Sequence, residues 1–189
     1  IILPPEMLHS QQYKDNTISI KSKNLVAEMT LDEKIGQMTQ VDHRYLEQQS
    51  DIKTYYLGSL LSGGGSAPDT NNPRSWVRMY NEYQDFALDT RLAIPLIYGI
   101  DAVHGHNNVY GATIFPHNIG LGCSNDEKLV QKISEATARE IRATGLDWTF
   151  APCLAVSQDE RWGRTFESYS EDTEIVTRLG VASIKGYQG

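Results

Sequence analysis

The chain has 189 residues, with 24 acidic and 17 basic side chains and a formal net charge of −7. This length supports one domain with a hydrophobic core, but it is shorter than the roughly 250 residues of a complete (β/α)8 barrel. The acidic balance argues against nucleic acid or an anionic membrane as a partner, because both favour a basic protein surface. No run of about 18 apolar residues occurs, so we expect no membrane-spanning helix.

Regular spacing of apolar residues predicts helices that alternate with short strands. Helices are expected over residues 22–38 (with an interruption), 73–89, 126–144 and 171–187, and strands over residues 38–41, 57–61, 94–100 and 146–151. This alternation indicates a parallel sheet whose strands are connected through helices.

The predicted helices carry start and stop signals and one apolar face each. The signals are the capping-box pair Thr30 and Glu33, then Pro73, Asp126 and Gly145. The residues expected to face inward are Trp76, Tyr80, Tyr83 and Ala87, then Leu129, Ile133, Ala136 and Ile141, and finally Ile175, Leu179, Ala182 and Gly186.

The N-terminus and the cysteines say little about the compartment. The first residues include no initiator Met and no basic segment followed by an apolar one, so no signal peptide is expected in this chain. Cys123 and Cys153 either pair or stay free. Because they lack the spacing of a metal site, we expect them to be small buried side chains.

The loops that follow strands are long and polar, whereas the connections from helix to strand are short. In (β/α) barrels the strand-to-helix loops build the active site, so chemistry is expected there. Residues 62–66, Ser-Gly-Gly-Gly-Ser, lack the ending of a P-loop and the pattern of a nucleophile elbow, and we interpret them as a flexible turn.

Asp101 directly follows the third predicted strand. A carboxylate at this position points into the mouth of a barrel, where it can accept hydrogen bonds from sugar hydroxyls or act as acid or base. The alternative is an aspartate that only caps backbone amides of its own loop.

His104 and His106 lie in the same loop and have two interpretations. A His-x-His pair at the end of a barrel strand can bind a metal, with His117 and Asp159 as possible further ligands. Because no spacing completes a set of three ligands, we favour histidines that order the loop by bonding to backbone or to neighbouring acids.

The loop after the fourth strand contains Arg161, Trp162, Arg164 and Glu167. An arginine presents a planar fork of donors that suits vicinal hydroxyls, and a tryptophan can stack on a sugar face or simply pack. Glu167 either pairs with Arg164 or is a catalytic carboxylate, and a purely structural salt-bridge cluster is the alternative.

Long ordered motifs from Leu25 onward resemble glycoside hydrolase family 3. They are residues 30–38 (TLDEKIGQM), residues 94–118 (IPLIYGIDAVHGHNNVYGATIFPHN), residues 150–156 (FAPCLAV), and residues 161–172, which include Trp-Gly-Arg and Glu-Ser-Tyr-Ser-Glu-Asp. The similarity is greatest to plant β-D-glucan exohydrolases and bacterial β-glucosidases.

The resemblance implies an α/β fold in which residues 1–189 form the N-terminal portion of an incomplete (β/α)8 TIM-like barrel, without the remaining strands and the α/β sandwich domain. It implies retaining, exo-acting release of glucose from the non-reducing end of β-linked glucans or β-glucosides, without a cofactor or metal. Asp101 and Arg164 would bind the terminal glucose, with Glu167 orienting Arg164. His104, His106 and Trp162 would support the loops.

The family's Lys-His pair, its nucleophilic Asp and its acid/base Glu would all lie beyond Gly189, so no catalytic residue is expected in this chain. An extracellular, cell-wall or periplasmic location is implied. Two other functions remain open: a metal-dependent hydrolase using His104 and His106, and a non-catalytic sugar-binding module. Within the family, β-N-acetylglucosaminidase and β-xylosidase activities are the alternatives.

Overall fold

A computed structural model describes the backbone of residues 5–189 and the side chains of residues 17–189. The first four residues, on which the prediction about a signal peptide partly rests, lie outside the described residues. The elements in chain order are α1 (Pro5–Glu28), α2 (Leu31–Gln37), β1 (Gln40–Asp42), η1 (His43–Tyr45), α3 (Asp51–Thr54), β2 (Ser59–Ser62), α4 (Pro73–Leu88), β3 (Ile97–Ile100), α5 (Asn118–Ser124), α6 (Glu127–Ala143), β4 (Trp148–Thr149), η2 (Thr165–Glu167) and α7 (Thr173–Gln188).

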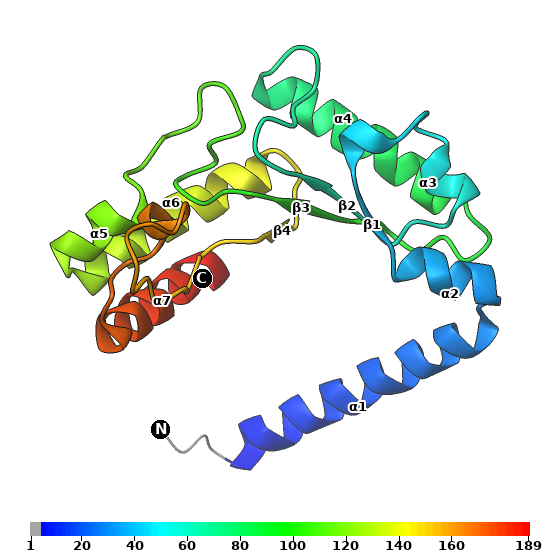
Figure 1. The fold of residues 1–189 in the computed structure, drawn as a ribbon. Coiled ribbons are helices and arrows are strands. Elements are labelled where there is room, and N and C mark those ends of the chain that lie inside the picture. Colours follow the sequence, from blue (N-terminus) through cyan, green and yellow to red (C-terminus); the bar gives the residue numbers. More distant parts are fainter. Residues whose placement is uncertain (1–4) are drawn as a thin grey trace.

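The four strands form one parallel sheet in the order β1-β2-β3-β4. Every strand is therefore next to the one that precedes it in the sequence, and helices make the crossovers, as the sequence predicts. Figure 1 shows α2 to α4 at one end of an arc, α5 to α7 at the other, and the strands between them. Helix α1 extends away from this arc.

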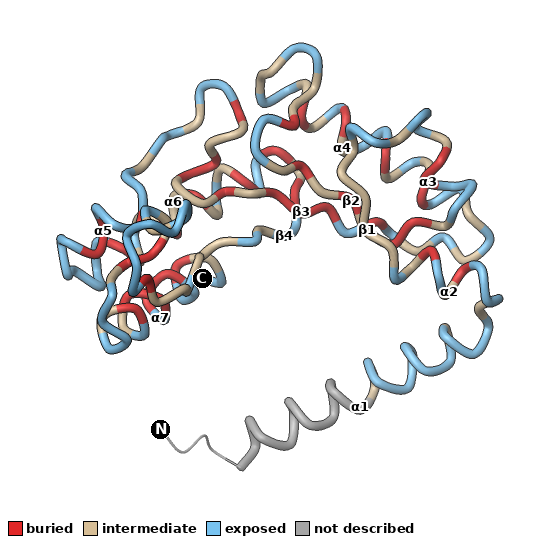
Figure 2. The backbone as a smooth tube through the Cα atoms, viewed as in Figure 1, coloured by how far each residue is buried: buried red, intermediate tan, exposed pale blue. Residues whose placement is uncertain are grey.

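Two clusters of buried side chains hold these layers together, and Figure 2 shows the buried residues along the strands and the inner sides of the helices. The larger cluster lies between the sheet and α4 and includes Trp76, Tyr98 and Ile100, all fully buried. The smaller one joins α6 and α7 and includes Val130 and Leu179. Each large apolar side chain buried in this way stabilises the fold by roughly 1.5–3 kcal/mol.

The predicted helix signals are confirmed. The Thr30 hydroxyl accepts the Glu33 amide at 3.2 Å, and the Glu33 carboxylate accepts the Thr30 amide at 2.8 Å. Arg91 also donates to Glu33, at 3.0 and 2.6 Å, and this guanidinium lowers the pKa of the carboxyl group to about 2. Asp126 caps α6, and Gly145 takes a φ of +87° after it.

Several predictions at the level of single residues are wrong. Leu129 is 41% exposed, because the inner face of α6 is made by Val130, Ser134, Thr137 and Ile141. Cys123 is exposed rather than buried, and both cysteines are free thiols. The short helices α3 and α5 lie in segments for which no helix or strand was predicted. Among the described helices, none is both long and apolar enough to cross a membrane.

Candidate functional site

The carboxyl ends of β1, β2 and β3 bring two carboxylates to one glycine. Asp42 ends β1, Gly63 follows β2, and Asp101 follows β3. A Cβ atom added at Gly63 would lie 3.5 Å from Oδ2 of Asp101 and 3.7 Å from Oδ2 of Asp42. Asp101 therefore stands at the sheet edge where a barrel would carry its active site, as predicted.

Asp42 anchors the glycine-rich turn that the sequence left without a role. Its carboxylate accepts the Ser66 hydroxyl at 3.0 and 3.1 Å and forms an ion pair with Arg44 at 2.8 Å. Asn108, from the loop after β3, donates to the Gly63 carbonyl at 3.3 Å. Asp42 was not predicted as a site residue, although it directly follows a predicted strand, as Asp101 does.

The Asp101 carboxylate accepts no hydrogen bond from the side chains or backbone of residues 17–189. This geometry contradicts the alternative in which Asp101 caps backbone amides of its loop. Burial raises the pKa of Asp101, while the Arg164 guanidinium lowers it and the Glu167 and Asp42 carboxylates raise it further. The carboxylate is thus an unused acceptor in a partly desolvated place.

Arg164 and Glu167 form an ion pair with two hydrogen bonds. Nε of Arg164 donates to Oε1 of Glu167 at 2.9 Å, and Nη2 donates to Oε2 at 2.6 Å. The Arg164 side chain is 63% exposed, whereas that of Glu167 is 14% exposed. Each group shifts the pKa of the other toward its charged form. The fork of Arg164 is therefore held by Glu167 while much of it still faces solvent.

Arg161 and Trp162 behave differently from Arg164. Arg161 pairs with Asp159 of its own loop, at 2.9 and 2.6 Å, and its side chain is 88% exposed. Trp162 is 41% exposed. The structural salt-bridge alternative thus describes Arg161, whereas Arg164 acts electrostatically on Asp101.

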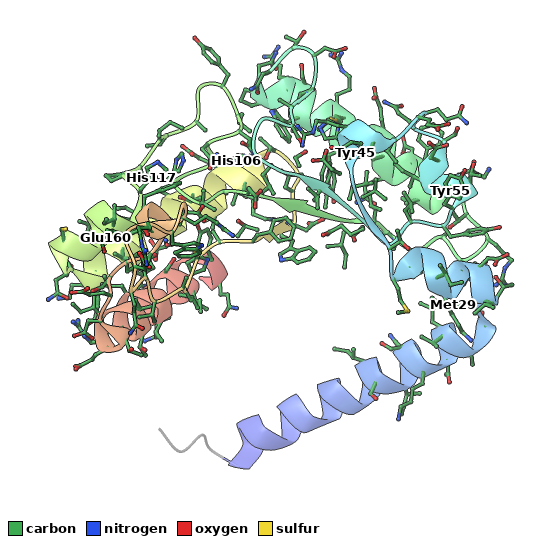
Figure 3. All side chains as sticks on the ribbon, viewed as in Figure 1. Met29, Tyr45, Tyr55, His106, His117 and Glu160 are labelled. Carbon is green, nitrogen blue, oxygen red and sulfur yellow. The ribbon has the colours of Figure 1, made fainter. Side chains whose placement is uncertain are left out.

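His106 is fully buried under the loop after β3, against Trp76, with ring centroids 6.1 Å apart (Figure 3). Its Nε2 lies 2.8 Å from the Thr144 hydroxyl, which itself donates to the Ile141 carbonyl at 2.7 Å. Nε2 therefore carries the proton of a neutral imidazole. Burial lowers the pKa of His106 to about 4. His106 bonds a threonine hydroxyl rather than the backbone or an acid, which differs from the prediction.

His104 contacts a different element. Its ring stands edge-on to that of His117, with centroids 4.2 Å apart. Gly105, between the two histidines, has a φ of +89°, and an added Cβ would overlap the Thr113 carbonyl oxygen. Among the side chains of residues 17–189, no three His, Cys, Asp or Glu residues are grouped closely enough to hold a metal ion.

Comparison with known proteins identifies the family. The glycosyl hydrolase family 3 N-terminal domain matches residues 30–189. The chain belongs to this family. Its resemblance to family 3 and its α/β fold, a fragment of a TIM-like (β/α)8 barrel, are thereby confirmed.

Similar family 3 proteins include a lysosomal β-glucosidase of Dictyostelium discoideum and a periplasmic β-glucosidase of Salmonella typhimurium. The first is 37% identical over 88% of this chain and 22% of its own length, the second 34% identical over 88% and 20%. A crystal structure of an exo-1,3/1,4-β-glucanase from a Pseudoalteromonas species is 44% identical, with a TM-score of 0.86, over 92% of this chain and 22% of its own. The chain thus spans about a fifth of the length of these relatives.

A β-glucosidase from Listeria innocua has been solved with ligands bound. Its complexes with glucose and, for a variant, with laminaribiose superpose on this chain with TM-scores of 0.68 and 0.70 at 34% identity, over 89% of this chain and 24% of theirs. The names of these relatives are β-glucosidase and exo-1,3/1,4-β-glucanase. The roles of individual residues in this chain remain predictions.

Proposed function

We propose that this chain is the N-terminal barrel portion of a retaining, exo-acting β-glucosidase or β-D-glucan exohydrolase that releases glucose from the non-reducing end. The observation that carries the proposal is that Asp101, an unused acceptor at the carboxyl end of β3, lies within electrostatic range of the exposed guanidinium of Arg164. A carboxylate and a guanidinium together suit neighbouring hydroxyls of one sugar ring. Relatives named β-glucosidase and exo-β-glucanase support the same assignment.

In this proposal the chain binds the sugar, and the residues that cleave the glycosidic bond lie in the rest of the polypeptide. A retaining glycosidase needs a nucleophile and an acid/base about 5–5.5 Å apart. Glu167 is engaged by both nitrogens of the Arg164 fork, so it is a poor candidate for either role. We therefore assign Asp101 and Arg164 to the terminal glucose and Glu167 to holding Arg164.

The test uses the complete polypeptide that contains this chain. Asp101→Asn should lower kcat/KM for an aryl β-glucoside by about 100-fold to 1000-fold, because hydroxyl contacts strengthen as the oxocarbenium-like transition state forms. Asp69→Asn, which alters an exposed aspartate of the β2–α4 loop, is the matched control and should retain wild-type kinetics. Unchanged kinetics in Asp101→Asn would refute the assignment.

The proposed substrates are β-glucosides rather than β-xylosides or β-N-acetylglucosaminides. Initial rates on aryl β-glucoside, β-xyloside and β-N-acetylglucosaminide should rank the glucoside first. Activity on the xyloside is the alternative with most support, because a β-xylosidase of Formosa agariphila is 32% identical over 93% of this chain. A protein that binds glucose but hydrolyses none of the three would instead be a sugar-binding module.

A metal-dependent hydrolase receives little support from the geometry. His106 is engaged with Thr144 and Trp76, while His104 stacks on His117. Stoichiometric zinc in the purified protein, lost together with activity on chelation, would reverse this ranking. We further propose a location outside the cytoplasm, supported by the periplasmic names of two relatives.

A further inference from the structure

The two loops that carry Asp101 and Arg164 are joined by contacts that the proposed function does not explain. His117 precedes α5, at the end of the loop after β3, and its ring meets Phe166 of η2 edge-on, with centroids 4.7 Å apart and planes at 80°. The next residue, Asn118, is buried and donates its side-chain amide to the Glu167 carbonyl at 2.8 Å. Two consecutive residues at the start of α5 thus contact two consecutive residues of η2.

His104 supports His117 from the opposite end of its loop. The two rings are 4.2 Å apart at 75°, and the His104 carbonyl accepts the Phe115 amide at 3.0 Å. Edge-to-face ring pairs prefer centroid separations of 4.5–7 Å, and the 4.2 Å separation of these two rings is shorter than that range. Loop residues near both of its ends therefore meet at His117, an exposed residue whose ring contacts those of both His104 and Phe166.

Close packing of α5 fixes η2 at the same place. A Cβ atom added at Gly122 of α5 would overlap the Tyr169 carbonyl oxygen, two residues beyond Glu167. Backbone meets backbone here without an intervening side chain, so η2 has little freedom to move relative to α5.

Glu167 restrains the Arg164 side chain through two hydrogen bonds to its guanidinium. An unrestrained arginine side chain samples many rotamers, and the Arg164 side chain is 63% exposed. Among the described residues, only Glu167 accepts hydrogen bonds from the Arg164 guanidinium. The hydrogen-bonded Arg164 guanidinium has the largest effect in lowering the pKa of the Glu167 carboxyl group, and the His117 and His104 side chains lower it further.

We propose that His117, with His104 stacked on it, is a positioning residue that orients Arg164 through η2 and Glu167 so that the guanidinium and Asp101 face the same sugar. The inference rests on the proposed function. His117 touches neither Arg164 nor the reacting atoms, and its effect passes through the ring of Phe166 and the element that carries Glu167.

A double-mutant cycle in the complete polypeptide tests this. His117→Ala should lower kcat/KM for an aryl β-glucoside about tenfold, in the range of coupling between neighbouring residues. The loss should divide between kcat and KM as it does in Arg164→Ala. In the Arg164→Ala background the same substitution should cost less than about twofold, because the residue through which it acts is already gone. His117→Phe keeps an aromatic ring against Phe166 and should recover most of the loss.

The matched control is Tyr110→Ala, which removes an exposed aromatic ring from the same loop and should leave the kinetics unchanged. A loss of the same size that persists in the Arg164→Ala background would overturn the proposal, because His117 would then act independently of Arg164. No loss in His117→Ala would overturn it as well.

A crystal structure of His117→Ala separates the positioning role from the proposed activity. The Arg164 guanidinium should be displaced relative to Asp101, whereas an undisplaced guanidinium would refute positioning whether or not the protein hydrolyses glucosides. Wild-type protein that releases no glucose would refute the proposed function alone.

Discussion

Asp101 and His106 lie five residues apart on one loop, and burial favours the neutral form of both. For Asp101 the opposing Arg164 guanidinium limits the effect, and the carboxylate stays free of hydrogen bonds from the described residues. For His106 burial alone determines the shift, and the imidazole is bound to Thr144 in the core. Burial therefore affects both residues, but Asp101 keeps a free carboxylate for a ligand whereas His106 is held in the core by Thr144.

The buried His106 should make folding sensitive to acid. Its pKa is about 4 in the folded protein against 6.5 as the reference value, so the unfolded chain binds the proton first. The contribution of neutral His106 to the free energy of unfolding is fully present above pH 6.5. It decreases by roughly 3 kcal/mol as the pH drops toward 4. Denaturant unfolding of wild type and His106→Gln at about pH 7 and about pH 4 measures this.

The variant cannot titrate at this position, so its free energy of unfolding should fall less between the two pH values. Tyr110→Ala, on the same loop, should keep the wild-type dependence and is the control. Equal pH dependence of the free energy of unfolding in wild type and His106→Gln would contradict a lowered pKa of His106 in the folded protein.

The site residues differ in how far the sequence could predict them. The location of Asp101 and Arg164 in loops that follow strands was predictable, because the ends of parallel strands gather at one edge, whereas their binding roles come from the resemblance to family 3 and stay predictions. The Thr144 partner of His106 was not, because it is 38 residues away and comes from the end of a helix. His117 was noticed only as a possible metal ligand, since ring stacking leaves no spacing pattern in the sequence.

At the scale of the elements, the sequence predicted α4, α6, α7 and the short α2, but it predicted only the last part of α1 and neither α3 nor α5. The buried face of α4 includes Trp76, Tyr83 and Ala87, as its spacing predicts. Helix α5 has the sequence Asn-Ile-Gly-Leu-Gly-Cys-Ser, whose two glycines disfavour a helix. Tertiary contact outweighs that preference, because only glycine permits the approach to Tyr169.

The glycines of α5 allow a direct test of this packing. Gly122→Ala should destabilise the protein by about 1–3 kcal/mol, since its methyl group would overlap the Tyr169 carbonyl and force η2 away. Gly120→Ala, in the same helix, would meet only Cβ of Pro116 at 3.5 Å and should be neutral or stabilising by up to about 1 kcal/mol. Thermal unfolding distinguishes the two, and equal melting temperatures would contradict the packing argument.

At the scale of the whole molecule, the sheet of the described residues is open. Strands β1 and β4 each pair on one side only within the described residues, and apolar side chains stay exposed beside β1, including Met38 at 88% and Ile35 at 57%. Open edges and exposed apolar surface promote association. Strand order was predictable from the alternation of elements, whereas Leu129 was wrongly placed inside because its helix packs through small residues such as Ser134.

We therefore expect the isolated 189-residue chain to self-associate and to leave an aryl β-glucoside intact. Sedimentation velocity over a range of concentrations measures the first, and release of the aryl alcohol the second. Replacing Ile35 with Glu and Met38 with Lys should reduce the association, whereas Lys128→Glu, on α6, should not. A monomer at every concentration, or measurable hydrolysis, would contradict this expectation.

The turn at Gly105 has a consequence for how this loop can change. The positive φ of Gly105 lets the His106 ring reach Thr144 while the His104 ring packs against His117, so we expect residues 104–106 to be exchangeable only together. The tip is freer: Tyr110 is 79% exposed, and a Cβ added at Gly111 would meet open space. Loop grafts between relatives with different sugar preferences should therefore be joined on the tip side of this tripeptide.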